Sequence, residues 1–245
     1  INPKIVLIEN VKGILTRDSG FAKDRIISNI TSLGYEVFCE VLNASDYGVP
    51  QNRFRAFFIG IKNGIKKKFK LFGQQNTKKI FVKDAIGELY VFEKEMKNDF
   101  RLNSKPDTEY RKYLRSDNNQ INNHEIVYPA EKTQEKIKYV KQGGNWRDIP
   151  EKLFPKLRSN RHSSAFKRLN EDDVSITIDT GNSHSNYFHP VFNRLPTVRE
   201  SARIQSFKDE FIFFGSRTSQ YRQVGNAVPP LLSKYLANII LETIS

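Results

Sequence analysis

The stretch Ile5-Val-Leu-Ile-Glu-Asn-Val11 constrains the fold most, because it is a short apolar run that ends in an acid. Residues 5–8 are too few for a helix and are rich in β-branched side chains, so they predict a central strand of an α/β sheet, buried on both faces. Such sheets bind ligands beyond the carboxyl ends of their strands. Glu9 is therefore predicted to lie at a binding site, although a solvated acid in a loop would leave the same local pattern.

Further helix and strand signals follow within the first 62 residues. A helix is predicted from about Phe21, capped by Asp18 or Ser19, and strands are predicted over residues 35–42 and 53–61. The order strand, helix, strand, loop, strand is typical of one half of a doubly wound, Rossmann-like sheet. The expected fold class is therefore α/β, with the other half of the sheet outside this chain.

Composition limits the classes of binding partner and the cellular compartment that we expect. The chain carries 40 Lys and Arg against 27 Asp and Glu, a formal net charge of +13, so a polyanion is the first partner to consider. The single cysteine, Cys39, excludes an internal disulfide and agrees with a reducing cytoplasm. No run of about 18 apolar residues occurs, so no membrane partner is expected. The four histidines lack metal-ligand spacing, and no metal is predicted.

A change of composition marks the end of the predicted sheet. Residues 62–79 contain seven lysines and no acid, with aromatic residues between them; this pattern is common on solvated faces and also suits a surface that lies along phosphates. We predict an α/β part at 1–62, a smaller irregular domain at 63–207, and a return segment at 208–245 whose helix packs on the α/β part.

Helix signals in the later part of the chain are local and clear. Thr197-Val-Arg-Glu200 is a capping box that predicts a helix start. Pro229-Pro230 opens a helix whose apolar stripe continues to Ile244. Shorter helices are predicted near residues 93–96 and 130–141.

Four stretches together resemble motifs of the C5-cytosine-specific DNA methyltransferase family. They are Glu9-Asn-Val11, Asp46-Tyr-Gly-Val-Pro-Gln-Asn-Arg-Phe-Arg55, Arg194-Leu-Pro-Thr-Val-Arg-Glu-Ser-Ala-Arg-Ile-Gln-Ser-Phe207 and Gly225-Asn-Ala-Val-Pro-Pro230. The first two look like the Glu-Asn-Val and Gln-x-Arg-x-Arg motifs, the third like the segment that closes the target recognition domain, and the fourth like the last motif. The resemblance implies the second half of a methyltransferase sheet plus an irregular target recognition domain.

The resemblance also implies catalytic roles. Cytosine C5 is a poor nucleophile, so a thiolate adds to C6 first, and this step becomes easier when charge developing at N3 and O2 is neutralised. Glu9 would contact N3, Arg55 would contact O2, and Arg53 would support Arg55. By strand alternation the two arginines are expected on one face, although most Arg-x-Arg pairs at a strand start are surface charges.

Binding roles follow from the same resemblance. Gly225, Asn226 and Ala227 would contact S-adenosylmethionine, although Gly-Asn before two prolines also suits a helix-entry turn. The partner would be double-stranded DNA from which the target base is flipped out. The residues predicted to bind that DNA are Lys66, Lys67, Lys68, Arg161, Thr177 and Ile178. Thr177-Ile178 would lie near the flipped nucleotide, and Gly143-Gly-Asn-Trp-Arg-Asp-Ile-Pro150 also looks like a stretch of some bacterial members.

Two family elements are missing. The sequence has no Phe-x-Gly-x-Gly loop for the methyl donor and no Pro-Cys nucleophile, and Cys39, in a predicted strand, is expected to be a core thiol. The chain is therefore expected to be the C-terminal part of a methyltransferase. It would be either a subunit of a split enzyme or a fragment, and an N-terminal half or companion chain would supply the nucleophile, within a bacterial restriction-modification system.

Three other functions remain open at this point. A non-catalytic DNA-binding specificity protein would keep the recognition domain and would not need Glu9 and Arg55 to share a pocket. An unrelated nucleotide-binding α/β enzyme is disfavoured, because no glycine-rich phosphate loop follows a predicted strand. An RNA-directed member of the same family is also conceivable, although the long recognition region favours DNA.

Overall fold

The computed structural model describes residues 1–65, 78–93, 100–153, 166–180 and 187–244. The chain forms two compact units. The sheet unit comprises Ile1–Gly48, Asn52–Lys78 and Leu231–Ser245, and the second unit comprises Val49–Gln51 and Lys79–Pro230. The chain thus passes between the units after Gly48, Gln51, Lys78 and Pro230, whereas the sequence predicted boundaries after residues 62 and 207.

The sheet unit contains three strands in the order β1-β3-β2: β1 (Ile5–Val11), β2 (Tyr35–Asn43) and β3 (Phe54–Lys62). β3 lies between the other two and is antiparallel to both. The prediction that residues 5–8 form a central strand buried on both faces is wrong for the described chain. Leu7 in β1 is 41% exposed, whereas β3, which is hydrogen-bonded along both edges, buries every residue from Ala56 to Ile61.

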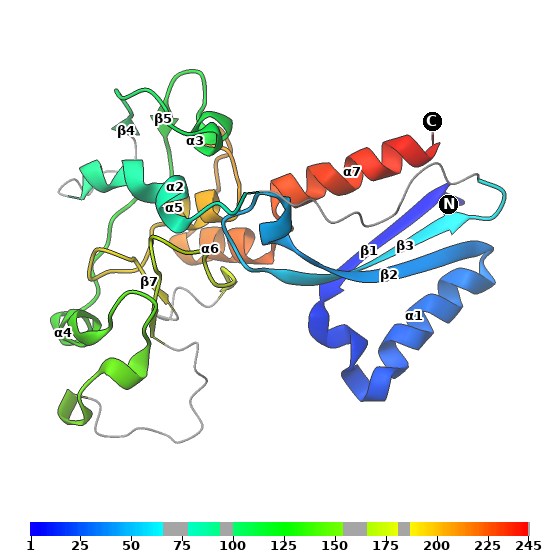
Figure 1. Ribbon diagram of the computed structural model, residues 1–245, viewed down its shortest axis with the longest axis horizontal. Coiled ribbons are helices and arrows are strands. Elements are labelled where there is room, and N and C mark those ends of the chain that lie inside the picture. The colour runs from blue at the N-terminus through cyan, green and yellow to red at the C-terminus, as the bar shows by residue number, and fades with distance from the viewer. Residues whose placement is uncertain (66–77, 94–99, 154–165, 181–186, 245) are drawn as a thin grey trace. The chain divides into compact units, whose positions relative to one another are not determined.

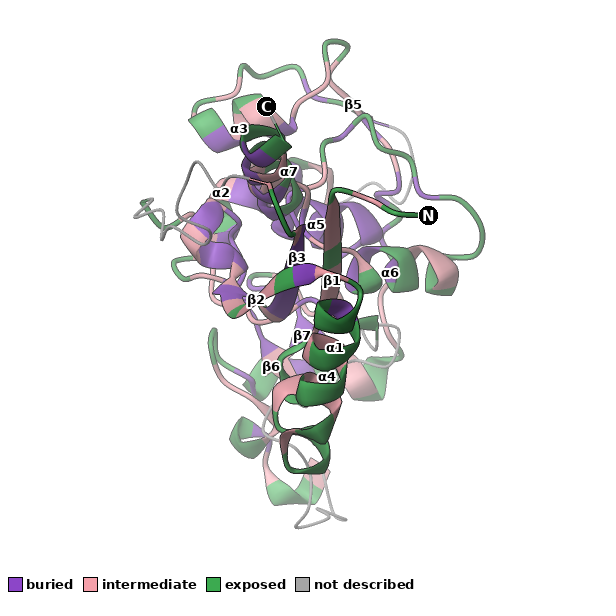
Figure 2. Cartoon of the chain, turned by 90° about the vertical axis from the view of Figure 1, so that its right-hand side faces the viewer, coloured by how far each residue is buried: buried purple, intermediate pink, exposed green. Residues whose placement is uncertain are grey.

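Helices lie on both sides of this sheet (Figures 1 and 2). α1 (Phe21–Ser32) lies on one side, and α7 (Pro230–Ile244) lies on the other. The short 3-10 helices are η1 (Lys12–Leu15), η2 (Arg17–Gly20) and η3 (Ala44–Tyr47). A β-carbon at Gly60 would lie 2.8 Å from Ile30 Cγ2, so the missing side chain lets α1 approach β3 closely.

The helix predictions for the sheet unit were largely confirmed. α1 begins at Phe21 as expected, but its N-cap is Gly20 with a φ of 93°, not Asp18 or Ser19. Both of those residues also have positive φ, so the chain turns sharply before the helix starts. Of the predicted apolar stripe of α7, Leu232, Leu236 and Ile239 are buried, whereas Ile244 is exposed.

The second unit is built from short elements. Its helices are α2 (Val82–Ile86), η4 (Gly87–Phe92), α3 (Glu109–Leu114), α4 (Glu131–Tyr139), η5 (Trp146–Asp148), η6 (Glu151–Leu153), α5 (Val198–Ile204) and α6 (Arg217–Asn226). Two small sheets join β4 (Phe100–Arg101) to β5 (Gln120–Ile121) and β6 (Lys167–Arg168) to β7 (Tyr187–Phe188). α4 confirms the helix predicted at 130–141, and most of the helix predicted at 93–96 lies outside the described residues.

α5 is the buried centre of the second unit, with all seven of its residues buried (Figure 2). The predicted capping box is confirmed: the Thr197 hydroxyl accepts the Glu200 N–H at 3.1 Å, and the Glu200 carboxylate accepts the Thr197 N–H at 2.7 Å. Two residues of this helix form ion pairs: Glu200 pairs with Arg194, and Arg203 pairs with Asp209. An irregular segment with few long apolar runs is thus held together in part by a buried polar network around this helix, beside small apolar clusters.

Candidate active site

Glu9 and Arg55 form an ion pair at one end of the sheet. Glu9 lies opposite Phe57 in the β1–β3 register, so Arg55 is its diagonal neighbour on the same face. Arg55 Nε lies 3.1 Å from Glu9 Oε1. The strands are antiparallel, so the carboxyl end of β1 and the amino end of β3 meet at this edge. β1 runs two residues beyond Glu9, which therefore lies just inside the strand end.

The face of the sheet that carries this pair can be assigned from strand alternation. Gly60 faces Ile30 of α1, so even-numbered residues of β3 point toward α1 and Arg55 points to the other side. Side-chain exposure is 15% for Arg55 and 30% for Glu9. Glu9 and Arg55 therefore lie on the same face of the sheet, and both side chains keep some exposure to solvent.

The Arg55 guanidinium keeps unused hydrogen-bonding capacity. Its Nη1 donates to the Phe54 carbonyl at 2.9 Å, and its Nε faces Glu9. Among the described residues, Arg55 Nη2 has no hydrogen-bond partner. Burial lowers the pKa of Arg55, and the Glu9 charge opposes that shift, so the guanidinium stays a fixed cation.

Arg53 lies next to this site in sequence but in a different setting. β3 begins at Phe54, so strand alternation alone does not place the Arg53 side chain. Its backbone N–H donates to Asn43 Oδ1 at 3.0 Å, and its carbonyl accepts the Ala44 N–H at 3.0 Å. Arg53 is 1% exposed. These contacts fix the start of β3 against the end of β2.

The predicted donor-binding residues lie at the end of α6. Gly225 and Asn226 are its last residues and Ala227 is the C-cap, so this turn ends α6 and also leads into α7 at Pro230, as the two prolines suggested. A β-carbon at Gly225 would lie 2.5 Å from the Asp179 carbonyl carbon, so glycine is required by the protein's own backbone. Gly225 is buried and Asn226 is exposed. The exposed side chain at this turn is therefore that of Asn226, whereas Gly225 packs against the protein's own backbone.

The predicted DNA-binding residues fall into two groups. Lys66, Lys67, Lys68 and Arg161 lie outside the described residues. Ile178 is 1% exposed, and its N–H donates to Gln51 Oε1 at 2.9 Å, whereas Thr177 is half-buried. Of that pair, only Thr177 retains side-chain exposure through which it could contact DNA.

Two buried glutamines were not predicted as functional residues. Gln51 Nε2 donates to Gln205 Oε1, and Gln205 Nε2 donates to the carbonyls of Ala227 at 2.7 Å and Val224 at 3.2 Å. Both glutamines are 0% exposed. We call this chain of hydrogen bonds, from the Ile178 N–H through Gln51 and Gln205 to these carbonyls, the glutamine relay. The quoted motifs contained both residues, but no sequence signal linked positions 154 apart.

Cys39 is not the core thiol that the sequence suggested. It lies in β2 opposite Phe58 and is only partly buried. Burial raises the pKa of the Cys39 thiol, and Lys23 opposes that shift. A raised pKa leaves less thiolate, the nucleophilic form, so the local environment does not activate this cysteine.

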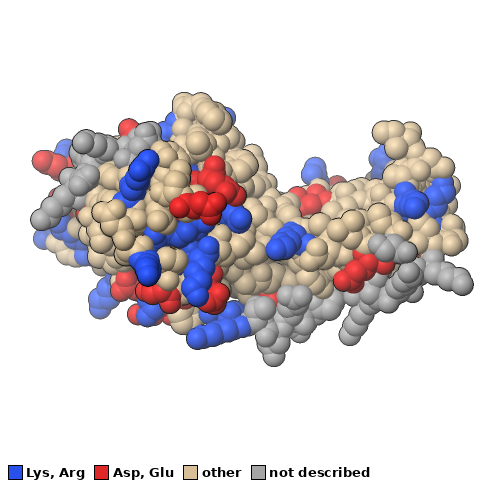
Figure 3. All heavy atoms as spheres, turned by 90° about the horizontal axis from the view of Figure 1, so that it is seen from above, with Lys and Arg blue, Asp and Glu red and all other residues tan. Residues whose placement is uncertain are grey.

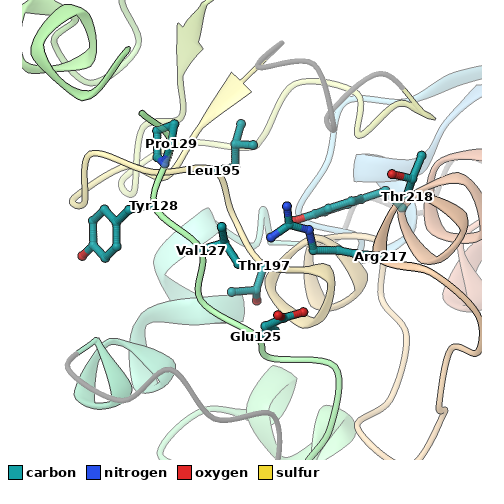
Figure 4. Close-up of a pocket in the computed structure, with 9 residues that line it drawn as sticks. Glu125, Val127, Tyr128, Pro129, Leu195, Thr197, Arg217 and Thr218 are labelled. Atoms are coloured by element: carbon teal, nitrogen blue, oxygen red, sulfur yellow. The ribbon is translucent and has the colours of Figure 1, made fainter. Parts of the chain in front are cut away.

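The second unit also holds a surface pocket of about 280 Å³ (Figure 4). It is lined by Glu125, Val127, Tyr128, Pro129, Leu195, Thr197, Arg217, Thr218 and Tyr221. Figure 4 shows the Arg217 side chain extending from the start of α6 between the other lining segments. None of the predicted site residues lines this pocket, and its two charged residues are of opposite sign.

Neither the surface charge nor the metal-binding residue types point to a further site among the described residues. On the face shown in Figure 3, Lys and Arg side chains are interspersed with Asp and Glu among the described residues. Within the described ranges, no group of three His, Cys, Asp or Glu is arranged to hold a metal ion. No helix in the same part of the chain is long and apolar enough to cross a membrane.

Comparison with solved structures defines the class of fold. A DNA modification methyltransferase encoded within an E. coli prophage has a TM-score of 0.76 at 22% identity, and the match covers 99% of this chain and 70% of that one. Dnmt2 methyltransferase of S. pombe has a TM-score of 0.54 at 18% identity, covering 99% and 66% of the two chains. The chain therefore has an α/β fold of the methyltransferase type.

Sequence comparison then gives the family. The chain belongs to the C-5 cytosine-specific DNA methylase family, which it matches over residues 1–242. It is 38% identical to the Type II methyltransferase M1.HphI of Haemophilus parahaemolyticus, over 98% of this chain and 57% of that protein. It is 32% identical to M.DdeI of Desulfomicrobium norvegicum, over 98% and 63%. The chain thus spans about three-fifths of the length of these relatives.

Proposed function

We propose that this chain is the C-terminal part of a DNA (cytosine-5-)-methyltransferase. The complete enzyme transfers a methyl group from S-adenosylmethionine to C5 of a cytosine flipped out of a specific duplex site. It belongs to a bacterial restriction-modification system, as the Type II names of its relatives suggest. The observation that carries this proposal is the Glu9–Arg55 pair, a carboxylate and a guanidinium 3.1 Å apart on one accessible face of the sheet.

The pair offers the two contacts that a reacting pyrimidine edge requires. Arg55 supplies N–H donors for the cytosine O2, where negative charge develops when a thiolate adds to C6. Glu9 lies within reach of the same edge and contacts N3 through a proton that it holds or shares with the ring nitrogen. Because Glu9 and Arg55 already orient each other, little rearrangement is needed when the base arrives. Arg53 fixes the loop that enters β3 and so supports Arg55.

The nucleophile and most of the donor site come from the N-terminal half or from a companion chain. The raised pKa of Cys39 and its position within β2 support this assignment. S-adenosylmethionine supplies the methyl group once it is bound. Among the described residues of this chain, the proposed contacts to it lie at the end of α6, where Asn226 is exposed, Ala227 is half-buried and Gly225 is buried.

The second unit is the target recognition domain in this proposal. Its short elements and polar core present irregular loops, and the chain's net charge of +13 favours contact with the phosphate backbone. Thr177, half-buried beside the buried Ile178, is the side chain proposed to lie near the flipped nucleotide. Lys66 to Lys68 and Arg161 contribute to backbone binding.

A second candidate is a DNA-binding specificity subunit without catalysis. The raised pKa of the Cys39 thiol agrees with this candidate as well as with the first one, because neither requires that thiol to react. The accessible Glu9–Arg55 pair argues against it, since a protein that only binds DNA needs no such pair at a sheet edge.

Substitution of the pair in the complete protein separates the two candidates. Glu9→Gln and Arg55→Ala are each expected to lower methyl transfer by about 100- to 1,000-fold, comparable to the loss of one preorganised transition-state contact. Duplex affinity should stay within about threefold of wild type. Methyl transfer is measured with a labelled donor, and affinity is measured by fluorescence anisotropy.

A matched control is available on the other side of β3. Glu40 in β2 also lies opposite Phe57, but it is exposed and does not pair with Arg55. Glu40→Gln makes the same chemical change in the same sheet and should retain activity. Activity that survives Glu9→Gln, or that is lost equally in both variants, would contradict the proposed roles.

A further inference from the structure

We propose that Gln51 and Gln205 are positioning residues that hold the recognition loop at residues 177–178 in register with the end of α6. This inference rests on the proposed function, because it concerns the loop placed near the flipped cytosine and the segment placed near the methyl donor. Neither glutamine touches a reacting group. Both act through the backbone groups that they bind.

The ends of the glutamine relay fix its direction. The Ile178 N–H can only donate, so it requires the Gln51 oxygen, and the Gln51 amide nitrogen must then face Gln205. The carbonyls of Ala227 and Val224 can only accept, so they require the Gln205 nitrogen. One donor end and one acceptor end therefore leave a single satisfied orientation for both side-chain amides.

Complete burial makes this orientation matter. Gln51 and Gln205 are 0% exposed, so water does not replace a lost partner. Reversing the Gln51 amide would place like groups against each other at two contacts, and reversing the Gln205 amide would do so at three. An unsatisfied buried donor or acceptor costs more than an ordinary hydrogen bond contributes. The relay is thus stable as a whole and poorly tolerant of partial disruption.

Residues 175–180, which include the recognition loop, contact two other segments of the second unit. On one side the Ser175 N–H donates to the Pro50 carbonyl at 3.0 Å, and Gln51 forms a parallel bridge with Ser175. On the other side Gly225 packs against the backbone of Asp179 and Thr180, where a β-carbon would lie 2.5–2.6 Å from backbone atoms. A shift of residues 175–180 therefore disturbs both neighbouring segments.

Sequence continuity links the relay to the proposed catalytic pair. Gln51 precedes Arg53 by two residues and Arg55 by four. A change in the backbone at Gln51 therefore reaches Arg55 through a very short length of chain. We infer that the relay makes the correct placement of the recognition loop a condition for the correct placement of Arg55. Its loss should affect the rate of reaction more than the affinity for DNA.

The test uses Gln51→Leu and Gln205→Leu in the complete protein, with Gln223→Leu as the matched control. Gln223 lies on α6 in the same unit and is exposed. For either relay variant we expect a 10- to 100-fold fall in the single-turnover rate of methyl transfer, as expected from one unsatisfied buried group. Duplex affinity should change less than twofold. A single-turnover rate per bound duplex does not depend on the fraction of protein that folds.

Amide hydrogen exchange gives a readout that needs no activity. Each relay substitution should accelerate exchange at residues 175–180 and also at 224–227, although each glutamine binds only one of these segments directly. Acceleration confined to the segment next to the substituted residue would overturn the relay. An unchanged single-turnover rate would overturn its role in positioning.

A conservative variant keeps the inference testable if the leucine variants fail to fold. A carboxyl group introduced by Gln51→Glu can donate to Gln205 only when it is protonated, so this variant should recover activity relative to wild type as the pH falls from 8.5 to 6. A relative rate that does not depend on pH would contradict the relay. A wild-type protein that transfers no methyl group would instead overturn the proposed function.

Discussion

Each of the two units contains a carboxylate–guanidinium pair. The two pairs differ in side-chain exposure and in the number of hydrogen-bond donors that have partners. In the sheet unit, Arg55 and Glu9 keep 15% and 30% of their side chains exposed. In the second unit, Arg194 and Glu200 are both 0% exposed. Arg194 donates to both Glu200 and Glu93 and also to the Leu195 carbonyl. The same chemistry thus occurs once as an accessible site and once as a closed structural centre.

Hydrogen-bond satisfaction distinguishes the two better than charge or distance does. All three guanidinium nitrogens of Arg194 have partners, and Glu200 also accepts the Thr197 N–H. Although burial acts to raise it, the Arg194 charge holds the pKa of Glu200 well below its usual range. Arg55 Nη2, by contrast, has no partner within the described part of the chain. Spare donor capacity on a partly exposed group is what a ligand can use.

The largest expected effect on stability is the loss of the closed pair. Glu200→Ala leaves Arg194 buried without one of its carboxylates and also removes the capping box of α5. We expect the second unit to lose about 3–5 kcal/mol of unfolding free energy. Trp146, the only tryptophan in the chain and part of the second unit, makes fluorescence-monitored denaturation a specific readout. A loss below about 1 kcal/mol would mean that this pair is no more structural than Glu9–Arg55.

Acid should weaken the second unit through the same group. The pKa of Glu200 is depressed in the folded state, so its contribution is complete above the ordinary glutamate pKa of 4.5 and is lost as the pH falls through the lower folded value. Glu88 lies between Arg115 and Arg203 and, although burial opposes this, also has a lowered pKa. We expect stability to fall steeply below pH 4.5, and less steeply in Glu200→Gln.

A backbone contact should give an intermediate effect. Gly225→Ala would place a β-carbon 2.5 Å from the Asp179 carbonyl carbon, and backbone cannot move aside as a side-chain end can. We expect a loss of about 1–3 kcal/mol, typical of overpacking. Denaturation monitored by Trp146 measures it, and Gly143→Ala, at a position with open space but a φ of 77°, serves as a comparison for strain alone. Equal losses in the two variants would argue against the close approach.

Features encoded by neighbouring residues could be predicted from the sequence. The capping box at Thr197 and the apolar stripe of α7 depend on spacings of three or four residues, and both are present. The position of β1 could not be predicted, because strand order depends on pairing between distant segments and a short apolar run suits an edge as well as a centre. α6 was missed because its sequence is polar and ends in Gly-Asn, a turn signal.

For the candidate site too, residues within local motifs could be predicted from the sequence, whereas contacts between distant segments could not. The family resemblance indicated Glu9 and Arg55. Their pairing follows from the register between β1 and β3, which the sequence did not show. The glutamine relay depends on contacts between residues more than 100 positions apart, which no local pattern indicates. The burial of Arg199 and Arg203 was equally hidden, because arginine is usually a surface residue unless it is paired.

The smallest expected effect is the loss of the accessible pair. Glu9→Ala removes a partly exposed interaction, and pairs of this kind contribute about 0–1 kcal/mol. Arg55 remains partly solvated after the change, so no charge is stranded in the interior. The unfolding free energy of the sheet unit should therefore fall by less than about 1 kcal/mol, measured by pulsed alkylation of Cys39 in denaturant. A loss as large as that of Glu200→Ala would place Glu9 among the structural residues and would remove the distinction between the two pairs.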